Sequence, residues 1–145
     1  MMKEVFKKSI QGGNVNLALL VVRISIAALM LTHGLPKLGK FFSDEPIVFA
    51  SIFGMGPELS LTLAVFSEVV CSIFLLVGLG TRLASVPLIV TMAIAAFYVH
   101  AADPFGIKEK AVLYLVGYIV LFMAGGGKYS IDHLIGKRDS NALSV

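Results

Sequence analysis

Glu68 is the side chain in this sequence with the clearest chemical potential, because it is an acid within an apolar run. It carries the only formal charge of Leu59–Gly80, a run of 22 residues. A helix of that length crosses the roughly 30 Å hydrocarbon layer of a bilayer. A charge near the middle of such a helix costs at least a few kcal/mol unless it is paired, hydrated or protonated. Glu68 is therefore predicted to have a partner on another segment, or to handle protons.

Arg23 is the predicted partner, as the only formal charge in the first apolar run, Leu17–Leu35. Helical rise places Arg23 roughly 9 Å, and Glu68 roughly 18 Å, from the same side of the membrane, so that extended side chains would meet. Such a pair is consistent with a structural lock between two helices. It is equally consistent with Arg23 setting the charge state of a Glu68 that passes protons in an inner cavity.

Two histidines are predicted to lie at one level near the opposite surface, together with Lys37. By helical rise, His33 and His100 are about 24 and 26 Å from the cytoplasmic ends of their spans. Histidines on facing helices can hydrogen-bond a quinone carbonyl, or ligate a haem or a metal. They are also found as interfacial residues partly in water, and the sequence leaves these alternatives open.

Tyr118 and Cys71 are the remaining candidates for the interior. Tyr118 lies deep in the last apolar run, where its hydroxyl needs a hydrogen-bond partner. Cys71 follows Glu68 by three residues, which places both on one helix face. A lone cysteine in an apolar segment is more often a small buried hydrophobe than a redox group. Because it is the only cysteine, an intrachain disulfide and a paired-cysteine metal site are excluded.

Composition identifies the class of protein that must position these residues. Of 145 residues, 57% are hydrophobic and only 14% are charged. A soluble domain of this size could not bury so much apolar surface, so we expect one integral membrane domain over residues 1–138 with a flexible tail at 139–145. The net charge of +3 is not gathered into one basic run, so nucleic-acid binding is not expected.

Four apolar runs are predicted to form membrane-spanning helices, at about residues 17–35, 59–80, 83–102 and 111–127. Counting Lys and Arg gives seven on the side of the two termini and four on the other, which predicts that both termini are cytoplasmic. The expected fold is an all-α, four-helix transmembrane bundle, N-in and C-in. A short helix over residues 44–53 is expected to lie at the interface.

Four short motifs resemble the DoxX family of small bacterial membrane proteins. They are Arg23 with HGLPKL at 33–38, Glu68 with GLGTRLAS at 78–85, EKAVLYL at 109–115, and GGGKYSID at 125–132. The family's closing motif usually has a proline where this chain has Gly126. The resemblance implies a four-helix protein of the bacterial inner membrane, often linked to redox reactions and related to the DoxD-like subunit of thiosulfate:quinone oxidoreductases. Nothing in the sequence selects a sulfur substrate.

The leading hypothesis is a redox-associated membrane subunit that binds a quinone-like ligand and takes electrons from a partner protein. Glu68 and Arg23 are the candidate catalytic residues, and the candidate ligand-binding residues are His33, His100, Tyr118, Lys37 and Cys71. One alternative is a non-catalytic anchor or assembly subunit, in which the polar pairs only hold helices together. Another is permeation of a small solute or of protons. Self-association into a homo-oligomer through glycine faces is compatible with each of these.

Overall fold

The computed structural model describes residues 12–142, and within this range the chain is helical, with connecting loops and no strand. The elements in chain order are α2 (Gly12–Gly39), η1 (Lys40–Phe42), η2 (Ile52–Gly54), α3 (Pro57–Val65), η3 (Phe66–Cys71), α4 (Ser72–Val77), α5 (Thr81–Ile94), η4 (Ala95–Val99), α6 (Phe105–Ala124) and α7 (Ile131–Ala142). Residues 1–11, with three of the lysines used to predict orientation, lie outside the described part.

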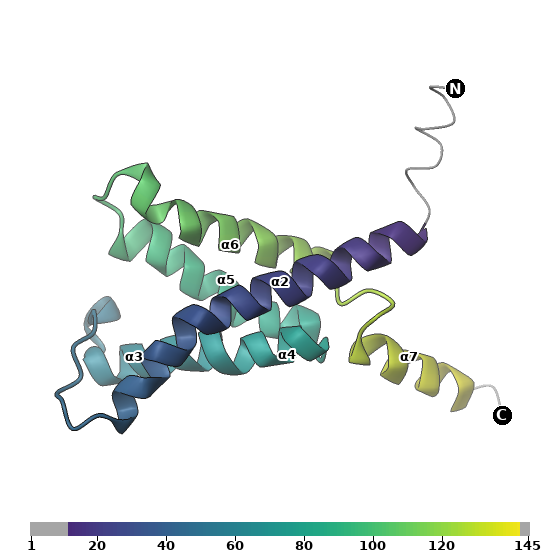
Figure 1. Ribbon diagram of the computed structural model, residues 1–145, viewed down its shortest axis with the longest axis horizontal. Helices are drawn as coiled ribbons and strands as arrows, with labels where there is room; N and C mark the ends of the chain where they lie inside the picture. The colour runs from purple at the N-terminus through teal and green to yellow at the C-terminus, as the bar shows by residue number, and fades with distance from the viewer. Residues whose placement is uncertain (1–11, 143–145) are drawn as a thin grey trace.

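The long helices pack side by side along the longest axis of the molecule (Figure 1). α3, η3 and α4 follow one another without a break, as do α5 and η4, so each group acts as one rod. α7 lies beyond one end of this bundle, close to where α2 begins and α6 ends (Figure 1). We call this end the Gly126 end, and the opposite end, where α2 finishes, the Lys37 end.

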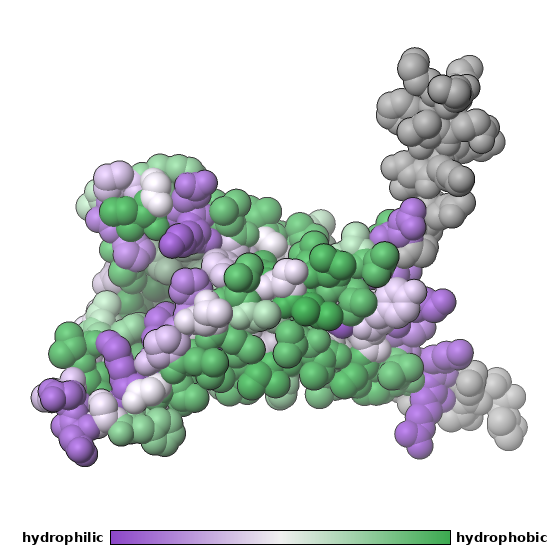
Figure 2. Space-filling view, viewed as in Figure 1, coloured by the Kyte–Doolittle hydropathy of each residue, from purple (hydrophilic) through white to green (hydrophobic). Residues whose placement is uncertain are grey.

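Three helical rods are long and apolar enough to cross a membrane: Asn14–Phe42, Pro57–Val77 and Thr81–Val99. Hydrophobic residues cover the middle of the visible face, while hydrophilic residues gather toward the two ends (Figure 2). These features are those of an integral membrane protein. α6 has 20 residues but opens with the charged run Lys108, Glu109 and Lys110. Its passage through the bilayer as a fourth span, and the N-in/C-in orientation, remain predictions.

The helix predicted over residues 44–53 is wrong. Residues 46–51 have no regular secondary structure, and only the short 3-10 turn Ile52–Gly54 follows. Ile47 and Phe49 pack on a small core cluster, whereas Val48 between them is 78% exposed. Alternate side chains point to opposite sides of an extended chain. The segment 46–51 is therefore extended and covers the core cluster with Ile47 and Phe49.

The helix bounds also differ from the predicted spans, most clearly in α2, α6 and the C-terminal tail. α2 continues through Pro36 to Gly39, and α6 begins at Phe105, six residues before the predicted start. The backbone of α7 is helical to Ala142, so the predicted flexible tail at 139–145 is helical in its first four residues. The remainder of that tail lies outside the described residues. The triple glycine ends α6 as expected, with Gly125 at φ 77°.

Candidate functional site

Glu68 lies in the π-helical segment η3, between α3 and α4. Short π-helical segments inside α-helices are rare, and they occur frequently at functional sites. The Glu68 residue is 2% exposed and lies against α2 at Gly34. A Cβ atom added at Gly34 would be 3.0 Å from the Glu68 backbone carbonyl carbon and Cβ. The absence of a side chain at Gly34 therefore brings the two helices together at the level of this carboxylate.

Lys37, rather than Arg23, is the partner of Glu68, so the predicted Arg23–Glu68 pair is wrong. Lys37 Nζ donates to Glu68 Oε1 at 2.5 Å. Lys37 reaches the carboxylate because α2 continues past Pro36, which carries the lysine one helical turn beyond Gly34. The Glu68 side chain is 3% exposed and that of Lys37 is 29% exposed, so the pair lies at the edge of the interior. The second carboxylate oxygen, Oε2, is buried and accepts no hydrogen bond from the residues that the structure describes.

An apolar groove of about 530 Å³ begins at this ion pair and lies between the α3–η3 and α5–η4 rods. Its polar lining includes Lys37, Ser67, Glu68 and His100. Much of the remaining lining is apolar and reaches the surface of the bundle, through the exposed side chains of Leu63, Phe66, Val86, Val90 and Val99. The groove therefore has a charged end at Lys37 and Glu68, and a side that opens where lipid chains would surround the protein.

The two candidate histidines are in different surroundings. His100 follows the second π-helical segment, η4, and lines the groove. Its Nδ1 lies 2.6 Å from Oδ2 of Asp103. His33 does not line the groove: its ring is exposed and packs edge-on against Tyr114, with 5.8 Å between ring centroids. Of the two candidate histidines, only His100 therefore lines the groove, and contact of either one with a ligand stays a prediction.

Tyr118 and Cys71 lie in the packed core and not along the groove. Tyr118 is fully buried and stacks on Tyr114, with 6.1 Å between ring centroids. Among the described residues, its hydroxyl lies near the Ser72 hydroxyl and meets no other polar side chain. Cys71 is a free thiol, 3% exposed, in the same core cluster as Met30.

Arg23 acts at the Gly126 end, where it binds the loop after α6. Its Nη1 donates to the carbonyl of Gly126 at 2.8 Å, and its Nη2 donates to the carbonyl of Tyr129 at 2.7 Å. The residue is 2% exposed and lies directly against Gly78, where any Cβ atom would collide with the guanidinium. Charge-assisted bonds to two carbonyls make Arg23 the centre of a folded-back C-terminal segment.

Asp132 holds the same segment to the turn between α4 and α5. Its carboxylate accepts hydrogen bonds from the backbone N–H groups of Gly80 (2.6 Å) and Thr81 (2.8 Å). Its own N–H donates to the carbonyl of Gly78 at 2.9 Å. Burial alone would raise the pKa of the Asp132 carboxyl, but the bonds from Thr81 and Gly80 and the charge of Arg23 together lower this pKa below its usual value.

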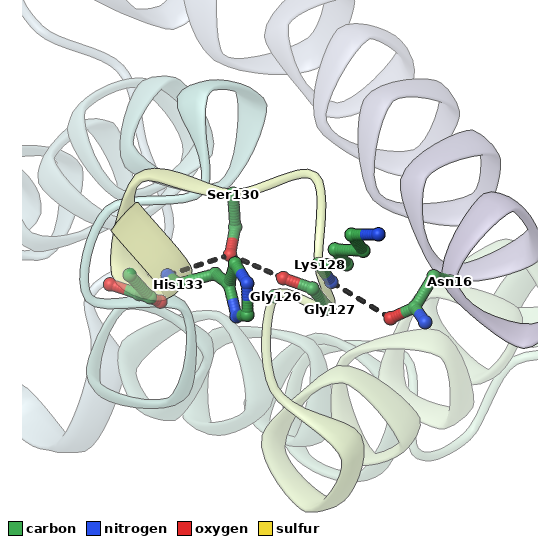
Figure 3. A pocket seen from close by; sticks show the side chains of 7 residues that line it. Asn16, Gly126, Gly127, Lys128, Ser130 and His133 are labelled. Carbon is green, nitrogen blue, oxygen red and sulfur yellow. Dashed lines mark hydrogen bonds between the residues drawn. The ribbon is translucent and has the colours of Figure 1, made fainter. Parts of the chain in front are cut away.

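A shallow pocket of about 510 Å³ lies beside this segment and involves Ser130 and Lys128 (Figure 3). Ser130 Oγ donates to the carbonyl of Gly127 at 2.6 Å and accepts from the N–H of His133 at 3.2 Å, which caps α7. The N–H of Lys128 donates to Asn16 Oδ1 at 2.8 Å. The polar groups around the pocket thus fix the loop in place.

Parts of three of the four sequence motifs meet at the Gly126 end, namely Arg23, the turn at 78–81 and the loop at 125–132, and sequence reasoning missed this. The turn after α4 has Gly78 and Gly80 in the left-handed conformation, at φ 73° and 57°, and Gly125 and Gly127 follow α6 at φ 77° and 71°. The paired glycines were a signal for two tight turns. They carried no information that Arg23 and Asp132 join the two turns, because that contact depends on helix packing.

The fold and these sites define a class: a small helical membrane protein with a charged pair at one end of an apolar groove. Residues 18–101 match the DoxX family, and the chain belongs to this family. It is 31% identical over 124 residues to an uncharacterised protein of Haemophilus influenzae, covering 81% of this chain and 90% of that one. A second uncharacterised H. influenzae protein is 26% identical over 134 residues, covering 88% and 89%. No solved structure matches the chain significantly.

Proposed function

We propose that this DoxX-family membrane protein binds an amphipathic, quinone-like ligand in the groove between α3–η3 and α5–η4. The observation that carries the proposal is the Lys37–Glu68 ion pair at one end of an apolar cavity, with the second Glu68 oxygen buried and unbonded. A buried acceptor of this kind is costly unless a ligand or water donates to it.

The size and lining of the groove support a small amphipathic molecule. Its volume of about 530 Å³ lies within the range of about 300–1,000 Å³ that is typical of small-molecule sites. A carbonyl of the ligand head would accept a hydrogen bond from the Lys37 ammonium. A ring hydroxyl of the reduced ligand would donate to Glu68 Oε2. An apolar tail would lie along Phe66 and Val90 toward the lipid.

His100 is the third group placed to orient the ligand head. It lines the same groove as Lys37 and Glu68, and its bond to Asp103 fixes the ring. A histidine whose second nitrogen is held by a carboxylate presents the other nitrogen in a defined orientation. This arrangement suits a redox-associated subunit of the bacterial inner membrane, with electrons supplied by a partner protein.

Titration of the protein, purified in mild detergent, with a short-tailed ubiquinone tests the proposal by calorimetry. His100→Ala is expected to weaken binding about 5–10-fold, the value of one hydrogen bond. The matched control is His33→Ala, which removes a histidine of the same membrane level outside the groove and is expected to leave binding unchanged.

Two results would contradict the proposed quinone site. Absence of saturable binding in the wild type, or equal effects of His33→Ala and His100→Ala, would reject the groove as a quinone site. The first of these outcomes would favour the non-catalytic anchor hypothesis, in which Lys37 and Glu68 only join helices.

A further inference from the structure

Three buried hydroxyl groups lie near Glu68, and two of them, those of Ser72 and Tyr118, lie within interaction distance of each other. They belong to Ser67, Ser72 and Tyr118, and the residues are 1%, 0% and 0% exposed. Among the described residues, Glu68 Oε2 and Ser67 Oγ are buried without a hydrogen-bond partner, and the Ser72 and Tyr118 hydroxyls meet only each other. Each would cost about 1–3 kcal/mol if it stayed unbonded, so the region is suited to hold internal water.

Ser67 and Glu68 are adjacent in η3, and Ser72 and Tyr118 lie farther toward the Gly126 end. Ser72 follows Glu68 by four residues, which places it about 6 Å farther toward the Gly126 end. Tyr118 lies near Ser72 and within the electrostatic reach of the Glu68 carboxylate. The polar region therefore extends inward from the ion pair by about one helical turn. We call Ser67, Glu68, Ser72 and Tyr118 the polar chamber.

An apolar layer closes the chamber toward the Gly126 end. Leu75 lies one turn below Ser72, and Leu121 lies one turn below Tyr118. Ala27 of α2 and Ala84 of α5 complete the layer, and all four residues are at most 4% exposed and belong to one core cluster. At and below this layer the buried polar side chains are Arg23, Thr81 and Ser85. The Arg23 Nη atoms donate to loop carbonyls and Ser85 Oγ donates to the Thr81 carbonyl, whereas Arg23 Nε and Thr81 Oγ1 have no partner among the described residues.

The Lys37 end has no comparable barrier. Lys37 is 29% exposed, and His100 is also partly exposed beside the same groove. A proton from water at this end thus needs to pass only the partly solvated Lys37 to reach Glu68. In contrast, a proton from the Gly126 end meets four closely packed hydrocarbon side chains.

We propose that the polar chamber binds internal water and exchanges protons with solvent at the Lys37 end only. The step is a simple transfer: a hydronium ion gives its proton to Glu68 Oε2, and water is left behind. The titratable groups that face Glu68 are Lys37 from α2, Tyr114 and Tyr118 from α6, and His100 at the end of η4. The proposal does not depend on which ligand occupies the groove.

Proton flux into vesicles containing the full chain and a trapped pH dye tests the apolar layer. The wild type is expected to be as tight as empty vesicles. Leu121→Ser should raise the flux at least several-fold by adding a hydroxyl to the layer, and Glu68→Gln in the same chain should abolish the increase. The control Leu113→Ser changes a leucine of the same helix that is 65% exposed, and should stay tight. A folded Leu121→Ser protein that stays tight would overturn the proposal, as would a leak that persists with Glu68→Gln.

A second experiment does not depend on whether Leu121→Ser folds, because it leaves the residues of the apolar layer unchanged. Vesicles are sorted by orientation through a biotin label on Phe42→Cys, a position 82% exposed at the Lys37 end, while the buried Cys71, 3% exposed, is kept. The infrared band of the protonated carboxyl, assigned by its loss in Glu68→Gln, should respond to acid added at the Lys37 end. An equal response to acid at the Gly126 end would contradict the proposal.

The same samples keep this proposal separate from the ligand proposal. Leu121 does not line the groove, so ubiquinone binding should be unchanged in Leu121→Ser. Loss of ubiquinone binding with sided protonation intact would reject only the groove ligand. Ubiquinone binding with two-sided protonation would reject only the chamber.

Discussion

The two ends of the molecule use a cation from the same helix for different purposes. Arg23 and Lys37 are 14 residues apart on α2. Arg23 is 2% exposed and gives two N–H groups to neutral backbone carbonyls of a loop. Lys37 is partly exposed and neutralises a carboxylate, one oxygen of which remains unbonded beside a groove. The first arrangement fixes a backbone, and the second leaves a charged site ready to meet a ligand.

The remaining polar groups follow the same division. At the Gly126 end, the Asp132 carboxylate and the Ser130 hydroxyl are both bonded to backbone groups. At the Lys37 end, the two rods that form the groove each contain a π-helical segment, η3 or η4. Two buried atoms at the Gly126 end, Arg23 Nε and Thr81 Oγ1, also have no partner among the described residues. The division therefore rests on the groove and the irregular helices beside the unbonded Glu68 oxygen, which indicate a functional role, and not on bonding alone.

Of the substitutions considered, the removal of the Arg23 guanidinium should lower the stability of the protein most. Arg23→Ala loses two charge-assisted hydrogen bonds and leaves the carbonyls of Gly126 and Tyr129 without their donor. We expect a loss of about 3–5 kcal/mol in the free energy of unfolding, measured by denaturant titration in detergent. Ubiquinone affinity of the fraction that remains folded should be unchanged. An Arg23→Ala protein of wild-type stability would show that the loop is held by other contacts.

Replacing Lys37 should destabilise the Lys37 end, and a second substitution at Glu68 should restore most of the lost stability. Lys37→Met leaves the Glu68 carboxylate buried without its cation, at an expected cost of about 3 kcal/mol. Adding Glu68→Gln removes the buried charge and should restore most of that stability. Ubiquinone binding is expected to be lost in Lys37→Met and to stay lost in the double variant. This cycle, measured by unfolding and by calorimetry, separates stability from binding. Binding that survives in the double variant would mean that the ion pair is structural.

Two glycines of one turn allow a smaller comparison at the Gly126 end. Gly78→Ala and Gly80→Ala both place a Cβ in the left-handed region, which costs about 1–2 kcal/mol. Only at Gly78 does that Cβ also meet the Arg23 guanidinium; at Gly80 nothing lies within 4 Å. Gly78→Ala should therefore be the more damaging in thermal unfolding. Equal losses would argue against the close Arg23 contact.

The smallest expected effect is a dependence of stability on pH through Asp132. Its pKa is lowered on folding from an ordinary value of 3.8. A lowered carboxyl pKa stabilises the fold above that ordinary value, and this stabilisation disappears as the pH falls through the lower, folded-state pKa. The difference in melting temperature between wild type and Asp132→Asn should be constant near neutral pH and shrink below about pH 4. A difference that grows on acidification would have the wrong sign.

Hydropathy and turn residues predicted the helices well, because an apolar run of sufficient length has few alternatives in a bilayer. The partner of Glu68 was mispredicted for a specific reason. Pro36 was expected to end the first helix, which would have left Lys37 in a loop, but α2 continues to Gly39 and presents the lysine beside Glu68. A proline disfavours continuation of a helix without forbidding it, so a depth argument from sequence favoured Arg23.

The groove and the C-terminal contacts could not be predicted because both depend on how rods pack. The sequence gives no indication that residues 66–71 and 95–99 become π-helical, and the groove lies between these two segments. Helical rise predicted that His33 and His100 lie at one level, and this stays a prediction. Rise alone cannot say which face of each helix meets a cavity, and only His100 lines the groove.

The central claim is that the Lys37 end binds a ligand and the Gly126 end does not. Photolabelling with a short-tailed azido-quinone, followed by peptide mass spectrometry, tests it most directly. The account predicts saturable labelling near Phe66 and Val90, lost in Lys37→Met/Glu68→Gln and retained in Asp132→Asn. Labelling that centres on residues 126–133, or that ignores the loss of the ion pair, would contradict it.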